Sequence, residues 1–110
     1  MTGALVEATR DNFRDLVSEG ITLVDLWGTD CQTCMALMPD VERLAEEKDG
    51  VKVVTLEAPK ARRLCMELKV LGLPAFLLFR DGEEVGRLAG PDLTASKLEA
   101  WLDENLEEVS

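Results

Sequence analysis

The order of apolar segments in this chain predicts an α/β fold in which helices cover a mixed sheet. Continuous apolar and β-branched runs, typical of buried strands, alternate with stretches whose apolar residues recur at helical spacing. Strands that alternate with helices are expected to pair in parallel. Near the C-terminal end, Arg80-Asp81-Gly82-Glu83 is a strong hairpin signal and adds antiparallel strands. The predicted order is β-α-β-α-β-α-β-β-α, a mixed five-stranded sheet flanked by four helices.

Each predicted strand is a short apolar run bounded by turn residues. The first begins at Leu5, and the others span 21–27, 51–56, 75–79 and 84–89. The predicted helices carry apolar residues three or four positions apart. They run from Thr9 to Gly20, from about 32 to 48, from 60 to 69, and from Thr94 onward. No linker, repeat or low-complexity stretch interrupts this order, so residues 1–110 are expected to form one domain.

Composition and charge exclude several classes of protein. The 110 residues include 12 basic and 22 acidic side chains, and the net charge of −10 is unsuited to nucleic acid or anionic membranes. The absence of histidine removes Ser–His and Cys–His catalysis and most zinc sites. No run approaches the roughly 18 apolar residues of a membrane span, and residues 1–7 lack an export signal. Three cysteines do not form a secreted disulfide framework, so we expect a cytoplasmic protein.

The chemistry is expected at Cys31-Gln32-Thr33-Cys34, between the strand 21–27 and the helix that follows it. A helix N-terminus presents unpaired N–H groups and the positive end of the helix dipole, and both favour a thiolate. A Cys-x-x-Cys pair in this position is typical of redox chemistry. Cys31, nearer the surface, is expected to attack, and Cys34 to resolve the mixed disulfide. The pair could instead be half of a metal or cluster site completed by Cys65, or an inert pair.

Three further residues have roles that the residue pattern leaves open. Asp25 interrupts an apolar strand, where burial would raise the pKa of its carboxyl and allow it to exchange a proton with Cys34; the alternative is a carboxylate pointing to water. Pro74 precedes a predicted strand, where a trans proline is expected from the residues alone. Cys65 lies on the apolar stripe of its helix, which favours a structural role over regulation by oxidation.

The sequence resembles the thioredoxin family over essentially its whole length. The shared landmarks occur in the family's order and spacing, and they are Val24-Asp25-Leu26-Trp27, Cys31-x-x-Cys34, Pro39, Gly72-Leu73-Pro74, Phe79-Arg80-Asp81-Gly82 and Gly90. The resemblance implies the thioredoxin fold, a redox-active disulfide Cys31–Cys34 with Cys31 as nucleophile, Asp25 as a buried acid and base, and Pro74 as a cis proline beside the dithiol. It also implies the reduction of protein disulfides, with no cofactor and no metal in this chain.

The residues around the dithiol differ from those of ordinary thioredoxins, which have Trp-Cys-Gly-Pro-Cys-Lys. Here the segment is Asp-Cys-Gln-Thr-Cys-Met, and Leu73 replaces the usual threonine or isoleucine before the cis proline. Asp30 disfavours the adjacent thiolate through like charge, whereas the Thr33 hydroxyl could donate a hydrogen bond to it. Thr55 stands where family members have a lysine near the buried aspartate. By this resemblance, the substrate-binding residues are Trp27, Asp30, Gln32, Thr33, Leu73, Pro74 and Gly90.

One subgroup is more similar, the atypical thioredoxins associated with the glycine, sarcosine and betaine reductase systems of amino-acid-fermenting anaerobes. The similar segments are 34–39, 60–64 and 69–74. This resemblance implies an electron carrier that a flavoprotein thioredoxin reductase, of an atypical kind, recharges. Its substrates would be disulfide-containing proteins, among them a component of such a reductase, and we expect a monomer. The altered residues also leave open a redox-inert thioredoxin-fold binding module, or a dedicated donor to a single reductase complex.

Overall fold

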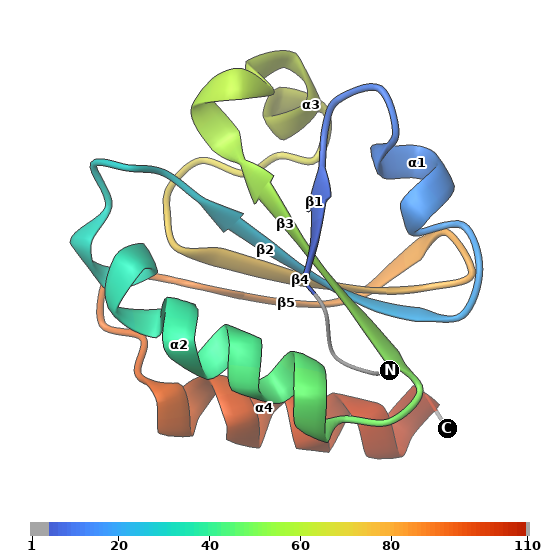
Figure 1. The fold of residues 1–110 in the computed structure, drawn as a ribbon. Coiled ribbons are helices and arrows are strands. Elements are labelled where there is room, and N and C mark those ends of the chain that lie inside the picture. The colour runs from blue at the N-terminus through green and yellow to red at the C-terminus, as the bar shows by residue number, and fades with distance from the viewer. Residues whose placement is uncertain (1–4, 110) are drawn as a thin grey trace.

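One five-stranded sheet forms the centre of the computed structural model, which describes residues 5–109. Its strands are β1 (Val6–Ala8), β2 (Ile21–Trp27), β3 (Val51–Glu57), β4 (Ala75–Arg80) and β5 (Glu83–Ala89). In the order β1-β3-β2-β4-β5, the first three strands are parallel, and β4 is antiparallel to both β2 and β5 (Figure 1). The predicted mixed sheet is confirmed. Residues 1–4, which carry part of the argument about export, lie outside the described residues.

Helices cover both faces of this sheet. They are α1 (Phe13–Leu16), α2 (Gln32–Glu47), α3 (Arg62–Glu67) and α4 (Ala95–Val109), with a 3₁₀ turn η1 (Ala58–Lys60) before α3. One core cluster packs α1 and α3 against one face, and a second packs α2 and α4, which lie side by side, against the other (Figure 1). The predicted element order is therefore confirmed. Within residues 5–109, no helix has the length and apolar character needed to cross a membrane.

Side chains along β2 alternate between the two core clusters. Val24 and Leu26 belong to the cluster under α1 and α3, whereas Leu23 belongs to the cluster under α2 and α4. Asp25 shares the face of Leu23, because residues two apart on a strand point to the same side. Since β2 pairs with β3 on one edge and with β4 on the other, this acidic side chain lies near the middle of the sheet, on the α2 side.

The first helix begins later than predicted. The regular helix starts only at Phe13, but Thr9 makes the contacts of a capping residue: its hydroxyl accepts the backbone N–H groups of Asp11 and Asn12 at 3.2 and 3.3 Å, and its carbonyl accepts the N–H of Phe13 at 3.0 Å. The Asn12 side chain accepts the Thr9 N–H at 2.7 Å, so side chains close a turn here before α1 starts at Phe13. Such reciprocal contacts between a threonine and the residue three positions later cap a helix, and the residues between them form a turn that precedes the regular helix.

The third helix is shorter than the predicted 60–69. Pro59 and Lys60 belong to the 3₁₀ turn, so α3 starts only at Arg62. At the other end, Lys69 has a left-handed φ of 59°, and the N–H of Val70 bonds back to the Cys65 carbonyl at 2.9 Å. A left-handed residue with such a bond is a common helix terminus. The helix therefore ends before the segment that leads to Pro74.

Arg87 on β5 holds the end of α3. Its guanidinium donates to the carbonyls of Leu68 and Lys69 at 2.6 and 2.9 Å. The same group makes a two-point ion pair with Glu84, with N–O distances of 2.7 and 2.8 Å. A cation satisfies the last carbonyls of a helix and interacts favourably with its dipole. The contact fixes the point from which the chain runs to Pro74.

Replacing Arg87 by methionine is expected to lower the free energy of unfolding by about 1–2 kcal/mol, because the charged hydrogen bonds to two carbonyls are lost while the apolar stem remains. Arg80→Met is the matched control. Arg80 is an exposed residue of β4 with no side-chain hydrogen bond or ion pair to residues 5–109, so its replacement should cost less than about 0.5 kcal/mol. Urea unfolding of both variants measures the difference, and equal losses would contradict the role of Arg87.

Candidate active site

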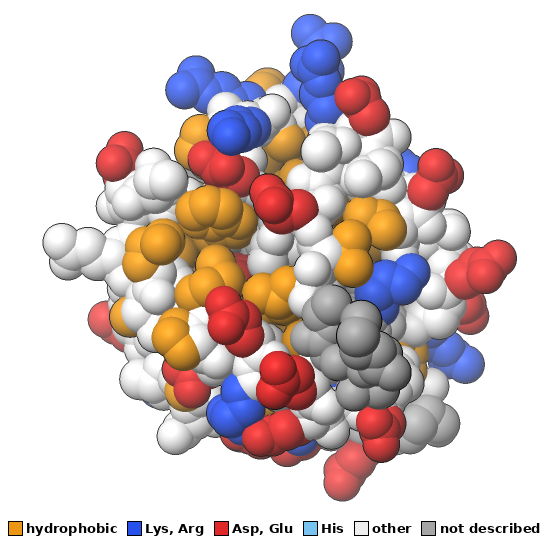
Figure 2. Space-filling view, in the orientation of Figure 1, with side chains coloured by type: hydrophobic (Ala, Val, Ile, Leu, Met, Phe, Trp, Pro, Cys, Tyr) orange, Lys and Arg blue, Asp and Glu red, His pale blue; other side chains and the backbone are white. Residues whose placement is uncertain are grey.

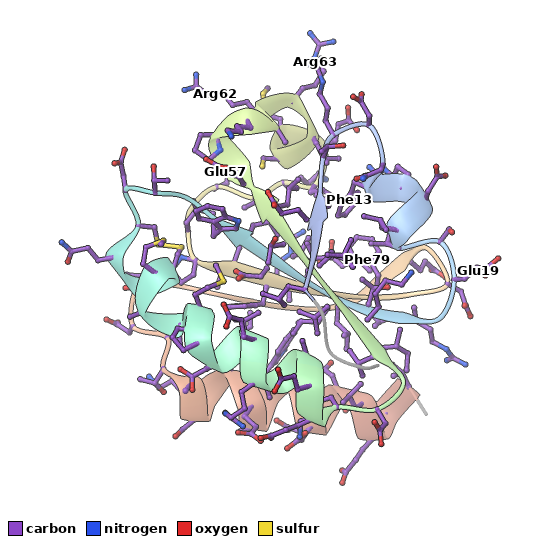
Figure 3. All side chains as sticks on the ribbon, in the orientation of Figure 1. Phe13, Glu19, Glu57, Arg62, Arg63 and Phe79 are labelled. Carbon is purple, nitrogen blue, oxygen red and sulfur yellow. A yellow bond between two sulfur atoms is a disulfide. The ribbon has the colours of Figure 1, made fainter. Side chains whose placement is uncertain are left out.

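A disulfide between Cys31 and Cys34 lies at the start of α2, with 5.2 Å between the two Cα atoms (Figure 3). Cys31 is the N-cap residue, with an extended backbone, and its Sγ accepts the backbone N–H of Cys34 at 3.1 Å. Cys31 is half-buried, whereas Cys34 is only 2% exposed. Cys31 is therefore the sulfur that another protein can reach.

The helix that follows favours a thiolate at Cys31. α2 is 16 residues long, so the unpaired N–H groups of its first turn and its dipole both act on the capping residue. One of those N–H groups already points at the Cys31 sulfur. A thiolate is the attacking form in disulfide exchange. When the pair is reduced, this geometry suits an exchange in which Cys31 and Cys34 pass between dithiol and disulfide.

Asp25 is buried in the sheet on the side covered by α2. It is 2% exposed and lies between Thr55 of β3 and Phe76 of β4 in the strand register. Its carboxyl has no hydrogen bond or ion pair with residues 5–109. Burial raises the pKa of Asp25 to about 7, so the carboxyl exchanges its proton near neutral pH. The alternative of a carboxylate pointing to water is wrong.

Asp25 and Cys34 lie on the same side of the sheet and at the same end of it. Cys34 belongs to the buried stripe of α2 that continues through Leu37 and Val41. Leu37 and Val41 pack in one cluster with Leu23, which shares its face of β2 with Asp25. Because the turn after β2 leads directly into α2, the first turn of the helix returns over the last residues of the strand. This arrangement places the buried thiol and the buried carboxyl on the same side of the sheet.

A shallow hollow of about 460 Å³ lies beside Cys31. Of the predicted site residues, it brings together Asp30, Cys31, Gln32, Thr33 and Leu73. The Leu73–Pro74 peptide bond is cis, as the family resemblance implies and contrary to what the residues alone favour. Pro74 is buried, and its carbonyl accepts the N–H of Gly90 at 3.2 Å. Gly90 and the half-buried Trp27 are not among the residues that line the hollow.

Three residues of this hollow were not predicted: Gly28, Pro59 and Pro91. A Cβ atom at Gly28 would approach Leu73 Cδ1 to 3.1 Å, so the glycine permits close contact between the turn after β2 and the cis-proline segment. Pro91 also explains a wrong expectation about Thr33. The Thr33 hydroxyl donates to the Pro91 carbonyl at 3.2 Å and is therefore not directed at sulfur. The only signal in the sequence that Pro91 belongs to the site was its position directly after Gly90, a predicted site residue.

Cys65 is remote from the dithiol. It packs in the cluster under α1 and α3, on the opposite face of the sheet from Cys34 and α2. Burial raises the pKa of the Cys65 thiol, and its Sγ contacts the Ala58 carbonyl at 3.8 Å. The three thiols do not converge, so the alternative of a metal or cluster site built from all of them is wrong. Cys65 occupies the place of a small core residue.

Two cysteines at a helix start that can pass between dithiol and disulfide, with a buried carboxyl on the same side of the sheet, are characteristic of one class of protein. The chain is a protein thiol–disulfide oxidoreductase, and it works by dithiol–disulfide exchange through Cys31 and Cys34. Comparison with known proteins gives the family. The sequence profile described as thioredoxin matches residues 4–104, and the chain belongs to the thioredoxin family. Nothing observed favours the alternative of a redox-inert module over this function.

Individual relatives are similar over most of their length. The chain is 37% identical to thioredoxin of Acetoanaerobium sticklandii over 101 residues, covering 89% of this chain and 96% of that one. It is 38% identical to thioredoxin of Peptoclostridium acidaminophilum over 105 residues, covering 93% and 96%. Among solved structures, a mutant thioredoxin from Halobacterium salinarum superposes with a TM-score of 0.84 at 26% identity, covering 94% and 91%. Proteins of this family act with a reductase and with protein substrates.

Proposed function

We propose that Cys31 attacks the disulfide of a substrate protein and that Cys34 resolves the product. The Cys31 thiolate forms a bond to one substrate sulfur, and the other substrate sulfur leaves as a thiolate that takes up a proton. Cys34 then attacks Cys31, which forms the Cys31–Cys34 disulfide and releases the second substrate thiol. Two electrons pass from the dithiol to the substrate. The difference in burial between the two sulfurs is the observation that supports this assignment.

Asp25 is proposed to move the proton of Cys34. A thiol must lose its proton before it attacks, and a buried thiol has no solvent base beside it. With a pKa of about 7, the Asp25 carboxyl is ready to accept that proton near neutral pH and to return it when the disulfide is reduced again. The burial of the carboxyl on the face of the sheet that α2 covers supports this role.

The substrate is proposed to dock over the hollow beside Cys31. An extended segment that carries the substrate disulfide would contact the turn before α2 on one side and the cis-proline segment on the other. Gly28 and Pro59 also line this hollow and would add to the contacts with the substrate. The residues proposed to contact it are Trp27, Asp30, Gln32, Thr33, Leu73, Pro74 and Gly90.

The partner is proposed to be specialised. Asp30, Gln32, Thr33 and Leu73 replace the residues that ordinary thioredoxins present beside the dithiol. The two bacterial relatives described above come from organisms that have glycine, sarcosine or betaine reductase systems. We therefore assign this chain the role of a cytoplasmic, monomeric, single-domain carrier between an atypical flavoprotein thioredoxin reductase and a component of such a reductase.

Reduction of the Cys31–Cys34 disulfide by a general NADPH-linked thioredoxin reductase tests this specialisation. We expect the rate constant kcat/KM to lie at least about tenfold below that for an ordinary thioredoxin, because the contact residues differ. The variant Gln32→Gly/Thr33→Pro, which restores the ordinary pair between the cysteines, should recover part of that loss. NADPH oxidation measures both reactions.

Dithiothreitol-driven reduction of insulin is the control, since it needs the dithiol but no reductase. Wild type and the double variant should both be active in that assay. If a general reductase accepts the wild-type protein as well as an ordinary thioredoxin, the specialised role is wrong while the exchange chemistry stands. If insulin is not reduced even with dithiothreitol, the proposed roles of Cys31 and Cys34 are wrong.

A further inference from the structure

A basic groove lies beside α3 on a protein that is strongly acidic. Its volume is about 600 Å³, and its lining includes five basic side chains, Arg10, Arg14, Lys60, Arg62 and Arg63, against the acidic Asp11 and Glu67. The whole chain has a net charge of −10, so this concentration of positive charge is local. Basic side chains gather at the upper edge of the molecule, where α3 lies, while acidic side chains are scattered over the whole of the visible face (Figure 2).

The positive charge of the groove is only partly neutralised. Three of the five basic side chains have a carboxylate partner: Arg14 lies 3.5 Å from Glu67, Lys60 lies 3.3 Å from Glu57, and Arg10 lies 3.8 Å from Asp11. All three basic side chains are more than half exposed, so these ion pairs are weak. Arg62 and Arg63 make no ion pair with any carboxylate of residues 5–109. Figure 3 shows these two side chains projecting outward from the start of α3. Both guanidinium groups are free to bind carboxylates in two-point contacts.

The basic groove adjoins the hollow at the redox site. Pro59 lines both the hollow beside Cys31 and the groove that Arg62 and Arg63 line. Lys60 follows Pro59 and also belongs to the groove. A polypeptide that passes over Cys31 and continues across Pro59 therefore enters the groove. The hollow and the groove therefore meet at Pro59.

We propose that the groove binds an acidic segment of the protein whose disulfide this chain reduces. The proposal rests on the function proposed above and names the chemistry of its substrate. An acidic partner is repelled by most of this molecule's surface and attracted at one place, so its approach is restricted to the orientation that brings its disulfide to Cys31. The groove adds a second contact region beyond the hollow, which raises specificity for acidic substrates.

Two peptides with the same disulfide test this proposal. One carries a flanking run of glutamates, and its twin carries glutamines instead. Wild type should reduce the glutamate peptide about tenfold more efficiently in kcat/KM at low ionic strength, and added salt should remove the preference. In the variant Arg62→Glu/Arg63→Glu, the preference should be lost or reversed, while kcat/KM for the glutamine peptide stays within about twofold of wild type.

The variant Lys52→Glu/Arg80→Glu is the control, because it changes the net charge by the same amount as Arg62→Glu/Arg63→Glu. Lys52 and Arg80 lie beside the first residues of β2, at the opposite end of the sheet from Cys31. This variant should keep the preference for the glutamate peptide. If both double variants lose it equally, net charge and not the groove is responsible, and the proposal is wrong. Equal reduction of the two peptides by wild type overturns it as well.

A binding measurement separates the groove from the exchange chemistry. The variant Cys31→Ser/Cys34→Ser cannot react, yet it should bind the fluorescently labelled glutamate peptide more tightly than the glutamine peptide, by about tenfold. Adding Arg62→Glu/Arg63→Glu should remove that difference. If the binding preference is present but the wild-type protein reduces neither peptide, the groove is supported and the proposed exchange roles are wrong. If the unreactive variant shows no preference, the groove proposal is wrong.

Discussion

Replacement of Cys31 by serine is expected to lower insulin reduction by at least about a thousandfold, because the exposed attacking thiolate is lost. Replacement of Cys34 should also stop turnover, but by a different route. In Cys34→Ser, Cys31 still attacks a substrate disulfide, and the mixed disulfide persists because no second thiol resolves it. Mass spectrometry of the trapped complexes measures this difference, and each adduct should link its partner through Cys31.

Cys65→Ser is the matched control for both variants. Cys65 lies in the core under α1 and α3, and it should be replaceable with activity within about twofold of wild type and only a modest loss of stability. Adducts formed through Cys34 in the Cys31→Ser variant at rates similar to those of Cys34→Ser would contradict the proposed division of roles between the two thiols. Loss of turnover in Cys65→Ser would bring the third thiol into the mechanism.

Replacement of Asp25 by asparagine is expected to remove most of a pH dependence of stability. Burial raises the pKa of Asp25 from 3.8 to about 7, so over this interval the folded protein holds a proton that the unfolded chain has released. Such a group contributes its full stability below its unfolded pKa, and this contribution is lost as pH rises through the folded pKa. A shift of this size corresponds to roughly 4 kcal/mol, since one pKa unit is about 1.4 kcal/mol.

Unfolding of the oxidised protein by urea, between about pH 4 and about pH 9, measures the effect. The stability of Asp25→Asn relative to wild type should rise by about 3–4 kcal/mol over this range. A fixed cost of burying the amide shifts the whole curve and does not change that slope. Asp30→Asn, which changes an exposed carboxylate at the same end of the molecule, should follow wild type. Parallel curves for wild type and Asp25→Asn would show that Asp25 is ionised over the whole range.

The same variant should also resolve mixed disulfides more slowly, by about a hundredfold at neutral pH, because Cys34 then lacks its proton acceptor. Single-turnover release of a labelled thiol from a preformed Cys31 adduct measures this step. Attack by Cys31 on a small disulfide should be nearly unchanged, which distinguishes a proton-transfer role from general disruption of the site. Equal slowing of both steps would contradict the assignment.

Much of the fold could be predicted from the sequence because its signals are local. Apart from Asp25, the run 21–27 is apolar or β-branched, and it became β2 with those bounds. The turn at 81–82 gave the hairpin, and Thr94 caps α4 by accepting the N–H of Lys97 at 3.2 Å. The errors at α1 and α3 arose where side-chain hydrogen bonds or a proline formed turns in place of helix. Such turns compete with the helix over three or four residues, and hydrophobic spacing does not detect them.

The candidate site was less predictable, because parts of it depend on contacts between distant segments. Cys31, Cys34 and Asp25 follow from the residue pattern, and Pro74 follows from the family resemblance. Pro59 and Pro91 enter the site only because four separate segments of the chain meet around the hollow. The basic groove has the same origin, since Arg10 and Arg14 come from the first part of the chain and Arg62 and Arg63 from its middle. No local pattern specifies which loops meet.

The central position of β2 has a consequence for how the two parts of the site respond to thermal fluctuations. Asp25 belongs to a strand that is paired along both edges, and such strands open only when the whole domain unfolds. Cys31, Pro59 and Pro91 belong to turns at the surface, where brief local opening is common. The turns that carry Cys31, Pro59 and Pro91 can therefore adapt to one partner after another, while Asp25, the proposed proton acceptor, stays in place. Partner choice and proton transfer are thus carried by regions of different local stability.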